Sequence, residues 1–302
     1  IVFKPLPPST GFTSTQSNIG KVEGDGFEVD LGVDIFQSEN DGFNWNTRAN
    51  LTTSEQIVTE QDDDQILYAG STDPVLGANA AIRGEQLGVI VGTRILRDDD
   101  GNFVVNGAGN YVVQDNVILD DGRSITPIIG NPNPDYVLNW INSLSYKNFN
   151  LGFQMNYTKG GDIASSTIGV LLGRGLITET EDRENTYILP GVQADGSENQ
   201  VQINNSQYYF NNVLFGPKEL QVYDASVIRL QELSLGYSLP KKFLDKTPFG
   251  SFSVTASGFN LWYDAYNTPD GANFDPNVAG VGVGNGRGFD YINGPSSKRY
   301  GL

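Results

Sequence analysis

The sequence predicts an all-β fold: part of an antiparallel transmembrane β-barrel, with about seven strands, short periplasmic turns and long extracellular loops. Several stretches alternate apolar and polar residues with a period of two, which puts the apolar side chains on one face of a strand. The 302 residues include 36 glycines, 14 tyrosines and 16 phenylalanines, a composition typical of a turn-rich β protein. Short and long connections alternate strictly along the chain, as they do in bacterial outer-membrane barrels.

The composition argues against several classes of function. With 19 basic and 36 acidic residues, the net charge of −17 argues against a nucleic-acid partner, which needs a basic face. The chain has no cysteine and no histidine, so it lacks disulfides, thiolate metal ligands and the commonest general base. No run of about 20 apolar residues occurs, so no transmembrane helix is expected. We therefore predict no catalytic residues, no cofactor and no enzyme activity.

Residues 1–18 are rich in proline, serine and threonine and are predicted to be irregular chain or the tip of a loop. The first long strand is expected near residues 20–36. Its two faces are Phe27, Val29, Leu31, Val33 and Ile35 against Glu28, Asp30, Gly32 and Asp34. At ~3.3 Å per residue, this apolar run matches the height of the apolar band of a tilted barrel strand. The carboxylates would then face a water-filled lumen, whereas in a soluble sandwich they would face solvent.

The remaining strands are expected in hairpins. A turn at residues 38–43 (SENDGF) leads into a strand over residues 43–51, whose polar face carries Arg48 opposite the carboxylates. A second hairpin covers residues 136–157, with its turn at Lys147 and Asn148. A third covers residues 223–261, and its first strand ends at Pro240 because proline lacks a ladder donor. A short final strand includes Tyr300 and Leu302.

Long polar connections separate these hairpins, at residues 59–134, 159–222 and 262–293. The first should contain short strands of its own, since it includes the apolar stretch 87–96. Asp98, Asp100 and Asn102 have the spacing of a calcium loop. They lack the following glycine and the distal glutamate, so we predict a solvated turn and no metal site. The segment GNGRG, residues 284–288, has no preceding strand and is expected to be a loop tip and not a phosphate loop.

Several segments resemble one protein family in the same order. They are IGNPNPDY at 129–136, KGGDI at 159–163, LPGV at 189–192, ASVIRLQELSLGYSLPKKFL at 225–244, SGFNL at 257–261 and FDPN at 274–277. Together they resemble the C-terminal barrel region of SusC/RagA-type TonB-dependent outer-membrane transporters, from about Thr10 to the end. The whole of residues 1–302 is thereby expected to be barrel wall and loops, and the family's plug domain is absent from this sequence.

The resemblance implies location in the cell outer membrane and TonB-dependent import of glycans or peptides. The implied partners are a SusD-like surface lipoprotein, TonB through the missing N-terminal part, and the lipid bilayer. Seven strands would leave open edges, so we expect the chain to be about the C-terminal third of a larger barrel. Earlier strands, or another outer-membrane protein, would then hold the edge near residues 20–36. The alternative is a surface-exposed β-rich binding or adhesion module without transport.

If this part of the chain contacts a sugar or peptide, exposed aromatic side chains are the best candidates, because flat rings supply apolar contact at low entropy cost. The candidates are Tyr208, Tyr209, Trp262, Tyr263 and Tyr266. Aromatic side chains that only pack the loops would give the same pattern.

Overall fold

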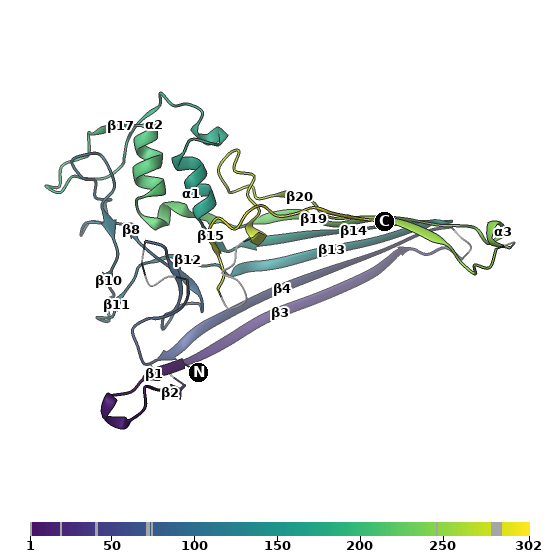
Figure 1. Cartoon of the computed structure of the whole chain (residues 1–302), viewed down its shortest axis with the longest axis horizontal. Coiled ribbons are helices and arrows are strands. Elements are labelled where there is room, and N and C mark those ends of the chain that lie inside the picture. The colour runs from purple at the N-terminus through teal and green to yellow at the C-terminus, as the bar shows by residue number, and fades with distance from the viewer. Residues whose placement is uncertain are drawn as a thin grey trace.

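The computed structural model describes residues 2–18, 20–39, 42–70, 73, 75–245, 247–278 and 286–302. Its largest element is a seven-stranded antiparallel sheet in the order β22-β20-β19-β14-β13-β4-β3 (Figure 1). The strands are β3 (Gly20–Phe36), β4 (Phe43–Gln61), β13 (Pro134–Tyr146), β14 (Phe149–Gly160), β19 (Val227–Ser238), β20 (Ser253–Asp264) and β22 (Arg299–Gly301). Each strand pairs with its neighbours in the chain, as the sequence predicted.

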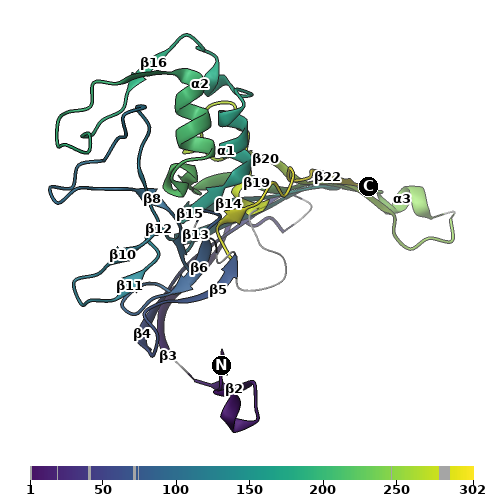
Figure 2. The same ribbon diagram turned by 60° about the vertical axis from the view of Figure 1, so that its left-hand side comes forward.

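The sheet is curved, and no second sheet formed by the described residues packs on it (Figure 2). Among the described residues β3 and β22 form its two edges and are not paired with each other, so the sheet does not close into a cylinder. Phe27 and Leu31 remain 59% and 63% exposed, and Leu235 remains 53% exposed. The expectation of one open, curved sheet and not two layers around a dry core is therefore confirmed.

Cross-strand register sorts the side chains by polarity. One row across the sheet joins Leu31, Ala49, Trp140, Met155, Leu230 and Trp262. A second row, next to the turns, joins Phe43, Tyr146, Phe149, Tyr237 and Val254. Because a one-residue slip would move every side chain to the other face, this register fixes one apolar and one polar face.

Short turns gather at one end of the sheet and long connections at the other (Figure 1). The β13–β14 turn has only Lys147 and Asn148 between its strands, and Lys147 has a φ of 51°. The β19–β20 turn contains the short helix α3 (Lys241–Leu244). Asn40 and Asp41 of the β3–β4 turn lie outside the described residues. The predicted alternation of short turns and long loops is confirmed.

The long connections fold together into a loop body with small sheets of its own. They contribute β5 (Ile66–Gly70), β6 (Ala78–Ala81), β7 (Val89–Val91), β8 (Arg94–Ile95), β9 (Val113–Gln114), β10 (Val117–Ile118), β11 (Ser124–Ile125), β12 (Ile128–Gly130), β15 (Asp162–Ser165), β16 (Thr186–Ile188), β17 (Gln202–Asn204), β18 (Val222–Asp224) and β21 (Phe289–Asp290). The apolar stretch at residues 87–96 supplies the buried side chains Val89, Ile90, Val91 and Ile95. Short strands in the first loop were therefore predicted correctly.

Helices in the loop body were not predicted. They are α1 (Ser166–Gly173), α2 (Asn205–Gln207), the π-helical segment Tyr208–Leu214 that continues α2, and short 3-10 turns at Thr178–Thr180, Lys218–Gln221 and Pro276–Val278. Ile168 and Leu172 of α1 pack with Tyr209, Val213 and Phe274 in a buried core. Eight residues give too little periodic pattern to identify a helix, whose stability here comes from that packing.

The first residues also differ from expectation. Residues 1–18 were predicted to be irregular chain or the tip of a loop, and no strands were expected there, but β1 (Val2–Pro5) and β2 (Ser14–Ser17) form a small antiparallel hairpin. A 3-10 turn at Pro8–Thr10 connects them, and the Thr10 hydroxyl donates to the Pro7 carbonyl at 2.8 Å. No helix among the described residues is both long enough and apolar enough to cross a membrane.

Candidate functional site: a two-faced sheet and its loop body

The apolar face of the sheet is exposed over most of its area. It is formed by large side chains that include Phe27, Leu31, Val33, Phe149, Leu151, Leu233, Leu235 and Val254. Soluble monomers rarely expose contiguous apolar patches of more than a few hundred Å², and larger ones mark contact with another protein or with a membrane. Contact of this apolar face with water alone is therefore unfavourable.

Aromatic side chains border the apolar face at both ends. At the turn end the rings of Phe149 and Tyr237 lie 4.8 Å apart. At the loop end the rings of Tyr136 and Tyr157 lie 5.9 Å apart, and the hydroxyl oxygens of Tyr157 and Tyr266 are 3.0 Å apart. Such paired rows are typical of the two interfacial belts of a membrane barrel.

Two polar oxygens on the apolar face accept hydrogen bonds from indole rings, whereas Asn142 Nδ2 is buried without a hydrogen-bond partner among the described residues. Asn142 interrupts the apolar alternation of β13, and its side chain is 1% exposed. Its Oδ1 accepts a hydrogen bond from Trp45 Nε1 at 3.0 Å. Trp140 Nε1 donates to Thr47 Oγ1 at 2.9 Å. The indole rings therefore cover two polar groups that would otherwise be costly in an apolar environment.

The polar face carries charged and amide side chains paired across the strands. The Arg48 guanidinium donates to both carboxylate oxygens of Asp30, with Nε 2.7 Å from Oδ1. Asn46 Nδ2 donates to Asp34 Oδ1 at 2.8 Å, and Asn156 Nδ2 to Asn139 Oδ1 at 3.0 Å. Arg48 thus meets a carboxylate as expected from the sequence. The opposite polarity of the two faces suits a wall between lipid and water.

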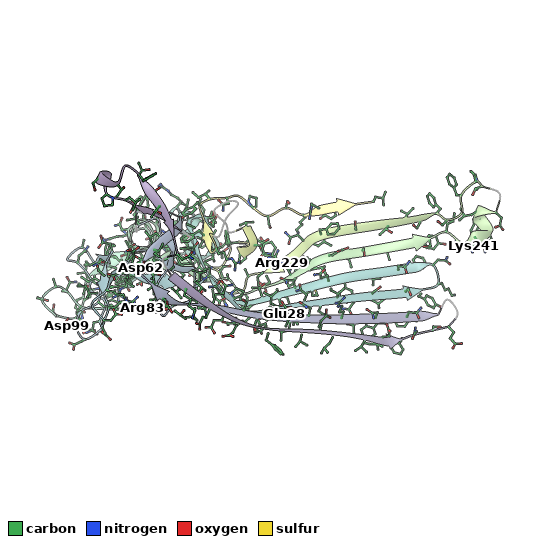
Figure 3. All side chains as sticks on the ribbon, turned by 90° about the horizontal axis from the view of Figure 1, so that it is seen from below. Glu28, Asp62, Arg83, Asp99, Arg229 and Lys241 are labelled. Carbon is green, nitrogen blue, oxygen red and sulfur yellow. The ribbon has the colours of Figure 1, made fainter. Side chains whose placement is uncertain are left out.

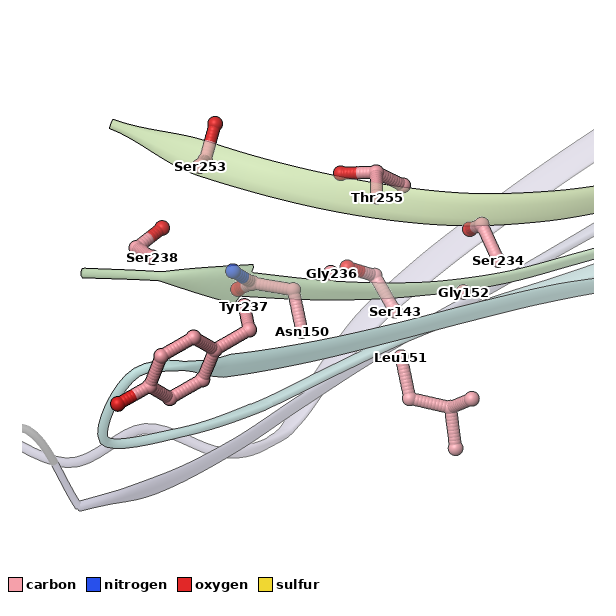
Figure 4. Close-up of a pocket in the computed structure, with 10 residues that line it drawn as sticks. All are labelled: Ser143, Asn150, Leu151, Gly152, Ser234, Gly236, Tyr237, Ser238, Ser253 and Thr255. Atoms are coloured by element: carbon pink, nitrogen blue, oxygen red, sulfur yellow. The ribbon is translucent and has the colours of Figure 1, made fainter. Parts of the chain in front are cut away.

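The polar face has a hollow of about 230 Å³ near the turns (Figure 4). Small side chains leave this space, among them Ser143, Ser234, Ser253 and Thr255 around Gly152 and Gly236. Leu151 and Tyr237 point to the other side of the sheet in the same view (Figure 4). A Cβ at Gly152 would lie 2.8 Å from Ser234 Oγ, so a larger residue there would displace the serine hydroxyl and fill part of the hollow.

A buried ion pair connects the sheet to the loop body. Arg229 of β19 and Asp275 of the FDPN segment are 4% and 3% exposed. Arg229 Nη2 donates to Asp275 Oδ1 at 2.6 Å, and Arg229 Nη1 donates to Asn260 Oδ1 at 2.8 Å. The Tyr263 ring lies 5.9 Å from the guanidinium carbon, and Tyr263 Oη donates to the Asn273 carbonyl at 2.6 Å. Figure 3 shows Arg229 where the sheet meets the loop body.

Arg229 determines the ionisation of its partner. Burial by itself would raise the pKa of the Asp275 carboxyl, but hydrogen bonds and charge from Arg229 outweigh it and hold the pKa below its usual value. Asp275 Oδ1 also accepts the Asn277 backbone N–H at 3.0 Å. We define this group, Arg229, Asn260, Tyr263 and Asp275, as the loop clamp.

A second buried polar group holds α1 in the loop body. Asp290 Oδ2 accepts from Ser165 Oγ at 2.8 Å and from the Thr167 backbone N–H at 2.9 Å. Lys218 Nζ donates to Gln221 Oε1 at 2.8 Å and to Ser166 Oγ at 3.2 Å. Burial lowers the pKa of Lys218 to about 8, and the charge of Asp290 offsets only part of that effect. The contacts of Asp290, and that of Lys218 with Ser166, join segments more than 50 residues apart.

The structure corrects the expected exposure of part of the predicted ligand set. Tyr209 was expected to be exposed, but it is 8% exposed and belongs to the core around α1. Tyr208 is half-buried against the same core, with its ring 4.7 Å from that of Tyr187. These rings are buried because the π-helical segment packs against α1. Trp262 and Tyr266 are exposed, but they lie with the apolar face and its loop-end aromatic row.

Tyr263 is on the polar face and is engaged in the loop clamp. The five predicted residues are therefore not gathered into one site, and ligand contact by any of them stays a prediction. The loop clamp was not predicted as a unit. Three quoted segments contain its residues, with Arg229 in 225–244, Asn260 in SGFNL and Asp275 in FDPN, but none of them indicates that these residues meet.

The segment weighed as a calcium loop is a hydrogen-bonded turn. Asp98 Oδ1 accepts the backbone N–H groups of Asp100 at 3.0 Å and Asn102 at 2.8 Å. Within the part of the chain that the structure describes, no group of three or more His, Cys, Asp or Glu side chains is placed to hold a metal ion. Gly284 and Asn285 of the GNGRG segment lie outside the described residues.

Comparison with known proteins agrees with this geometry. No family model matches the chain. TonB-dependent receptor P3 of Formosa agariphila is 29% identical over 276 residues, covering 85% of this chain and 26% of that protein. TonB-dependent receptor P26 of the same organism is 26% identical and covers 93% of this chain and 28% of that protein. The chain thus spans little more than a quarter of the length of these relatives.

The fold has solved counterparts. A structure of the RagAB peptide transporter superposes with a TM-score of 0.57 at 18% identity, covering 98% of this chain and 30% of that chain. The RagAB peptide importer in its open-open state gives 0.58 at 17% identity and covers 99% of this chain. The fold is therefore an open antiparallel β-sheet similar to part of these transporter structures. The resemblance to SusC/RagA-type TonB-dependent transporters, expected from the sequence motifs, is confirmed.

Proposed function

We propose that this chain forms barrel wall and extracellular loops of an outer-membrane, TonB-dependent nutrient importer. The observation that supports this proposal most strongly is the opposite polarity of the two faces of one curved sheet. Its apolar face is exposed and is bordered by aromatic rows at both ends. In lipid, backbone polar groups must be satisfied within a helix or a closed barrel, so such a sheet is suited to a barrel completed by further strands. The proposal assigns no catalytic step to this chain.

The proposal orients the chain in the membrane. The apolar face contacts lipid, the polar face with Arg48 and Asp30 lines the lumen, and the turns face the periplasm. The loop body then lies outside the cell. A SusD-like surface lipoprotein would dock on the loop body, by analogy with the two-component transporters that superpose on the chain. TonB would act through a part of the protein that this chain does not contain.

The substrate class is proposed to be an oligomer, either a peptide or a glycan. The solved counterparts are named as peptide transporters, and this supports a peptide by analogy only. Tyr263 is the one predicted ligand residue on the polar face, and we propose it as a wall contact near the substrate path. Trp262 and Tyr266 are better suited to the membrane interface, where amphipathic rings are favoured.

Membrane fractionation tests the proposal against a surface-exposed binding or adhesion module. We expect the full-length protein to stay in the outer-membrane pellet after high-salt and carbonate washes, and to need detergent for release. It should also migrate faster on gels before boiling, as closed membrane barrels do. Release by salt or carbonate without detergent would contradict a barrel wall and favour the adhesion module.

A further inference from the structure

The turn between β19 and β20 differs from the two-residue turn beside it. Residues 239–252, defined here as the anchor turn, contain α3 and extend past the ends of the strands (Figure 1). The Phe243 N–H donates to the Pro240 carbonyl at 3.0 Å, and both N and Oγ1 of Thr247 donate to the Leu244 carbonyl at 2.8 Å. Leu244 is 7% exposed. The described residues of the anchor turn therefore have a defined conformation.

Three phenylalanines project from the anchor turn. Phe243, Phe249 and Phe252 are 59%, 61% and 51% exposed. Phe252 continues the apolar face, because its carbonyl accepts from Leu239 N at 2.8 Å and it has the same parity as Val254 of β20. The Phe252 ring is thus contiguous with the apolar face at its turn end, next to the row that contains Tyr237, and the exposed Phe243 and Phe249 belong to the same turn.

Lysines accompany these rings. Lys241 and Lys242 are exposed on α3, and Lys242 Nζ lies 5.0 Å from the centre of the Phe243 ring. On the neighbouring turn Lys147 Nζ lies 5.1 Å from the Tyr146 ring, and the two turns meet where Ser238 N donates to the Asn148 carbonyl at 2.9 Å. Figure 3 shows Lys241 at the far end of the molecule from Asp62 and Asp99 of the loop body.

This local charge is opposite to that of the chain, whose net charge is −17. Lysine beside exposed aromatic side chains is typical of segments that lie in the headgroup region of a membrane. The apolar stems and rings enter the boundary of the acyl chains while the ammonium groups attract anionic headgroups. A protein partner would need a complementary shape, whereas a lipid surface needs only this combination of apolar contact and charge.

We propose that the anchor turn binds anionic phospholipid in the leaflet that faces the turns. Phe243, Phe249 and Phe252 enter that leaflet, and Lys241 and Lys242 attract its phosphates. This inference rests on the proposed barrel, but it adds a lipid-selective contact at one turn that a barrel wall does not require. The anchor turn would fix the depth of β19 and β20 in the membrane.

Site-directed fluorescence tests the depth of the anchor turn. This chain has no cysteine, so a bimane label can be placed at Phe243→Cys in the full-length protein, with the labelled parent as background. In nanodiscs we expect bromine-labelled lipid to quench the label strongly and aqueous iodide to quench it weakly. Leu235→Cys is the matched label on the apolar face, and Ser145→Cys reports the polar face.

The controls separate the two proposals. If the labels at positions 235 and 243 are both inaccessible to lipid, the barrel wall itself is wrong. If position 235 is quenched by lipid but position 243 only by iodide, the barrel stands and the anchor is wrong. If position 243 is reached by neither quencher, another protein covers the turn and the lipid contact is also wrong.

Charge selectivity is tested with the same label. Brominated phosphatidylglycerol should quench position 243 more than brominated phosphatidylcholine at equal mole fraction, with a local preference on the order of fivefold per lysine. Lys241→Gln with Lys242→Gln should remove this preference. Lys21→Gln with Lys298→Gln removes the same charge from exposed lysines outside the turns and should leave it intact. Equal quenching by both lipids in the parent would overturn the anionic-lipid assignment.

Discussion

Arg229 and Asp275 show how one pair of side chains attaches a long loop to the wall of the sheet. Both are nearly fully buried, so removing one partner leaves the other charge without compensation. Each also has a second partner, Asn260 for the arginine and the Asn277 backbone for the carboxylate. The stability of the loop clamp should therefore decrease on conservative substitution of either residue as well as on truncation to alanine.

We predict that Arg229→Ala frees the loop that contains Asp275. Breaking a buried ion pair costs on the order of 3–5 kcal/mol, so backbone amides near Asp275 should exchange faster with solvent. Hydrogen-exchange mass spectrometry measures this directly. Arg48→Ala, which breaks an exposed pair with Asp30, is the matched control and should leave the exchange of this loop unchanged. Equal protection in the Arg229 variant and the parent would contradict the clamp.

The Asp275 pKa gives the clamp a pH dependence with a definite sign. Because the pKa of Asp275 in the folded protein is below its ordinary value of 3.8, the stabilising contribution of the carboxylate is present above that value and is lost as the pH falls through the folded pKa. We therefore expect loop opening in strong acid. Asp275→Asn should be less stable at neutral pH and should lose this acid dependence, which exchange measured on both sides of pH 4 would reveal.

Lys218 should affect the stability of the loop body at alkaline pH. Burial lowers its pKa to about 8 from 10.5, so between these values the unfolded state binds more protons and stability rises with pH. The full difference corresponds to roughly 3 kcal/mol as an order of magnitude. Lys218→Met should flatten the dependence of loop-body protection on pH between 8 and 10. The exposed Lys241→Met is its control, and an unchanged slope in the Lys218 variant would refute the assignment.

At the scale of single elements, β3 offers two neighbouring positions at nearly the same depth whose side chains point to opposite faces of the sheet. Leu31 lies on the apolar face and Gly32 on the polar face, one residue apart. An added Cβ at Gly32 would meet no heavy atom within 4 Å, so a side chain can begin there without a clash, beside Asp30 and opposite Arg48. The two positions allow the proposed lipid face to be tested within one strand.

We predict that Leu31→Arg strongly impairs barrel insertion and that Gly32→Arg does not. Arginine on the lipid face of a membrane barrel costs ~2–4 kcal/mol near the bilayer midplane, whereas arginine in a water-filled lumen keeps its hydration. The folded fraction after refolding into lipid vesicles, read by the gel shift before boiling, measures the difference. Similar loss in both variants would argue against lipid contact at Leu31.

For the whole molecule, the two open edges are the decisive feature. β3 and β22 are not paired with each other among the described residues, and an unpaired backbone group in lipid costs several kcal/mol. In the proposed barrel, other strands would have to pair with these edges. The part of a larger barrel that these seven strands occupy stays a prediction, as does the identity of the strand that pairs with β3.

We therefore predict that residues 1–302 expressed alone do not insert as a closed monomeric barrel. Refolding into detergent should give aggregates or strand-paired oligomers, while the full-length protein gives a single heat-modifiable species. Size-exclusion chromatography with light scattering distinguishes these results. A monodisperse, heat-modifiable monomer of the 302-residue chain would show that the sheet can close without other strands.

Alternation along the sequence determined the two faces, the hairpin partners and the end at which the loops gather. This information is local, because a period of two and a turn of fixed length specify face and register without distant residues. The ordered motifs also identified the family resemblance. These properties were correct for β3 and β4 and for the β13–β14 and β19–β20 hairpins.

Tertiary structure alone decided the interior of the loop body. The helix α1 depends on Asp290, more than 120 residues away, and Tyr209 is buried because a π-helical segment packs on that helix. Arg229 and Asp275 meet across 46 positions, and nothing in the local pattern of either residue indicates the other. Contacts between segments so distant in sequence are set by packing of the whole loop body, which local periodicity does not encode.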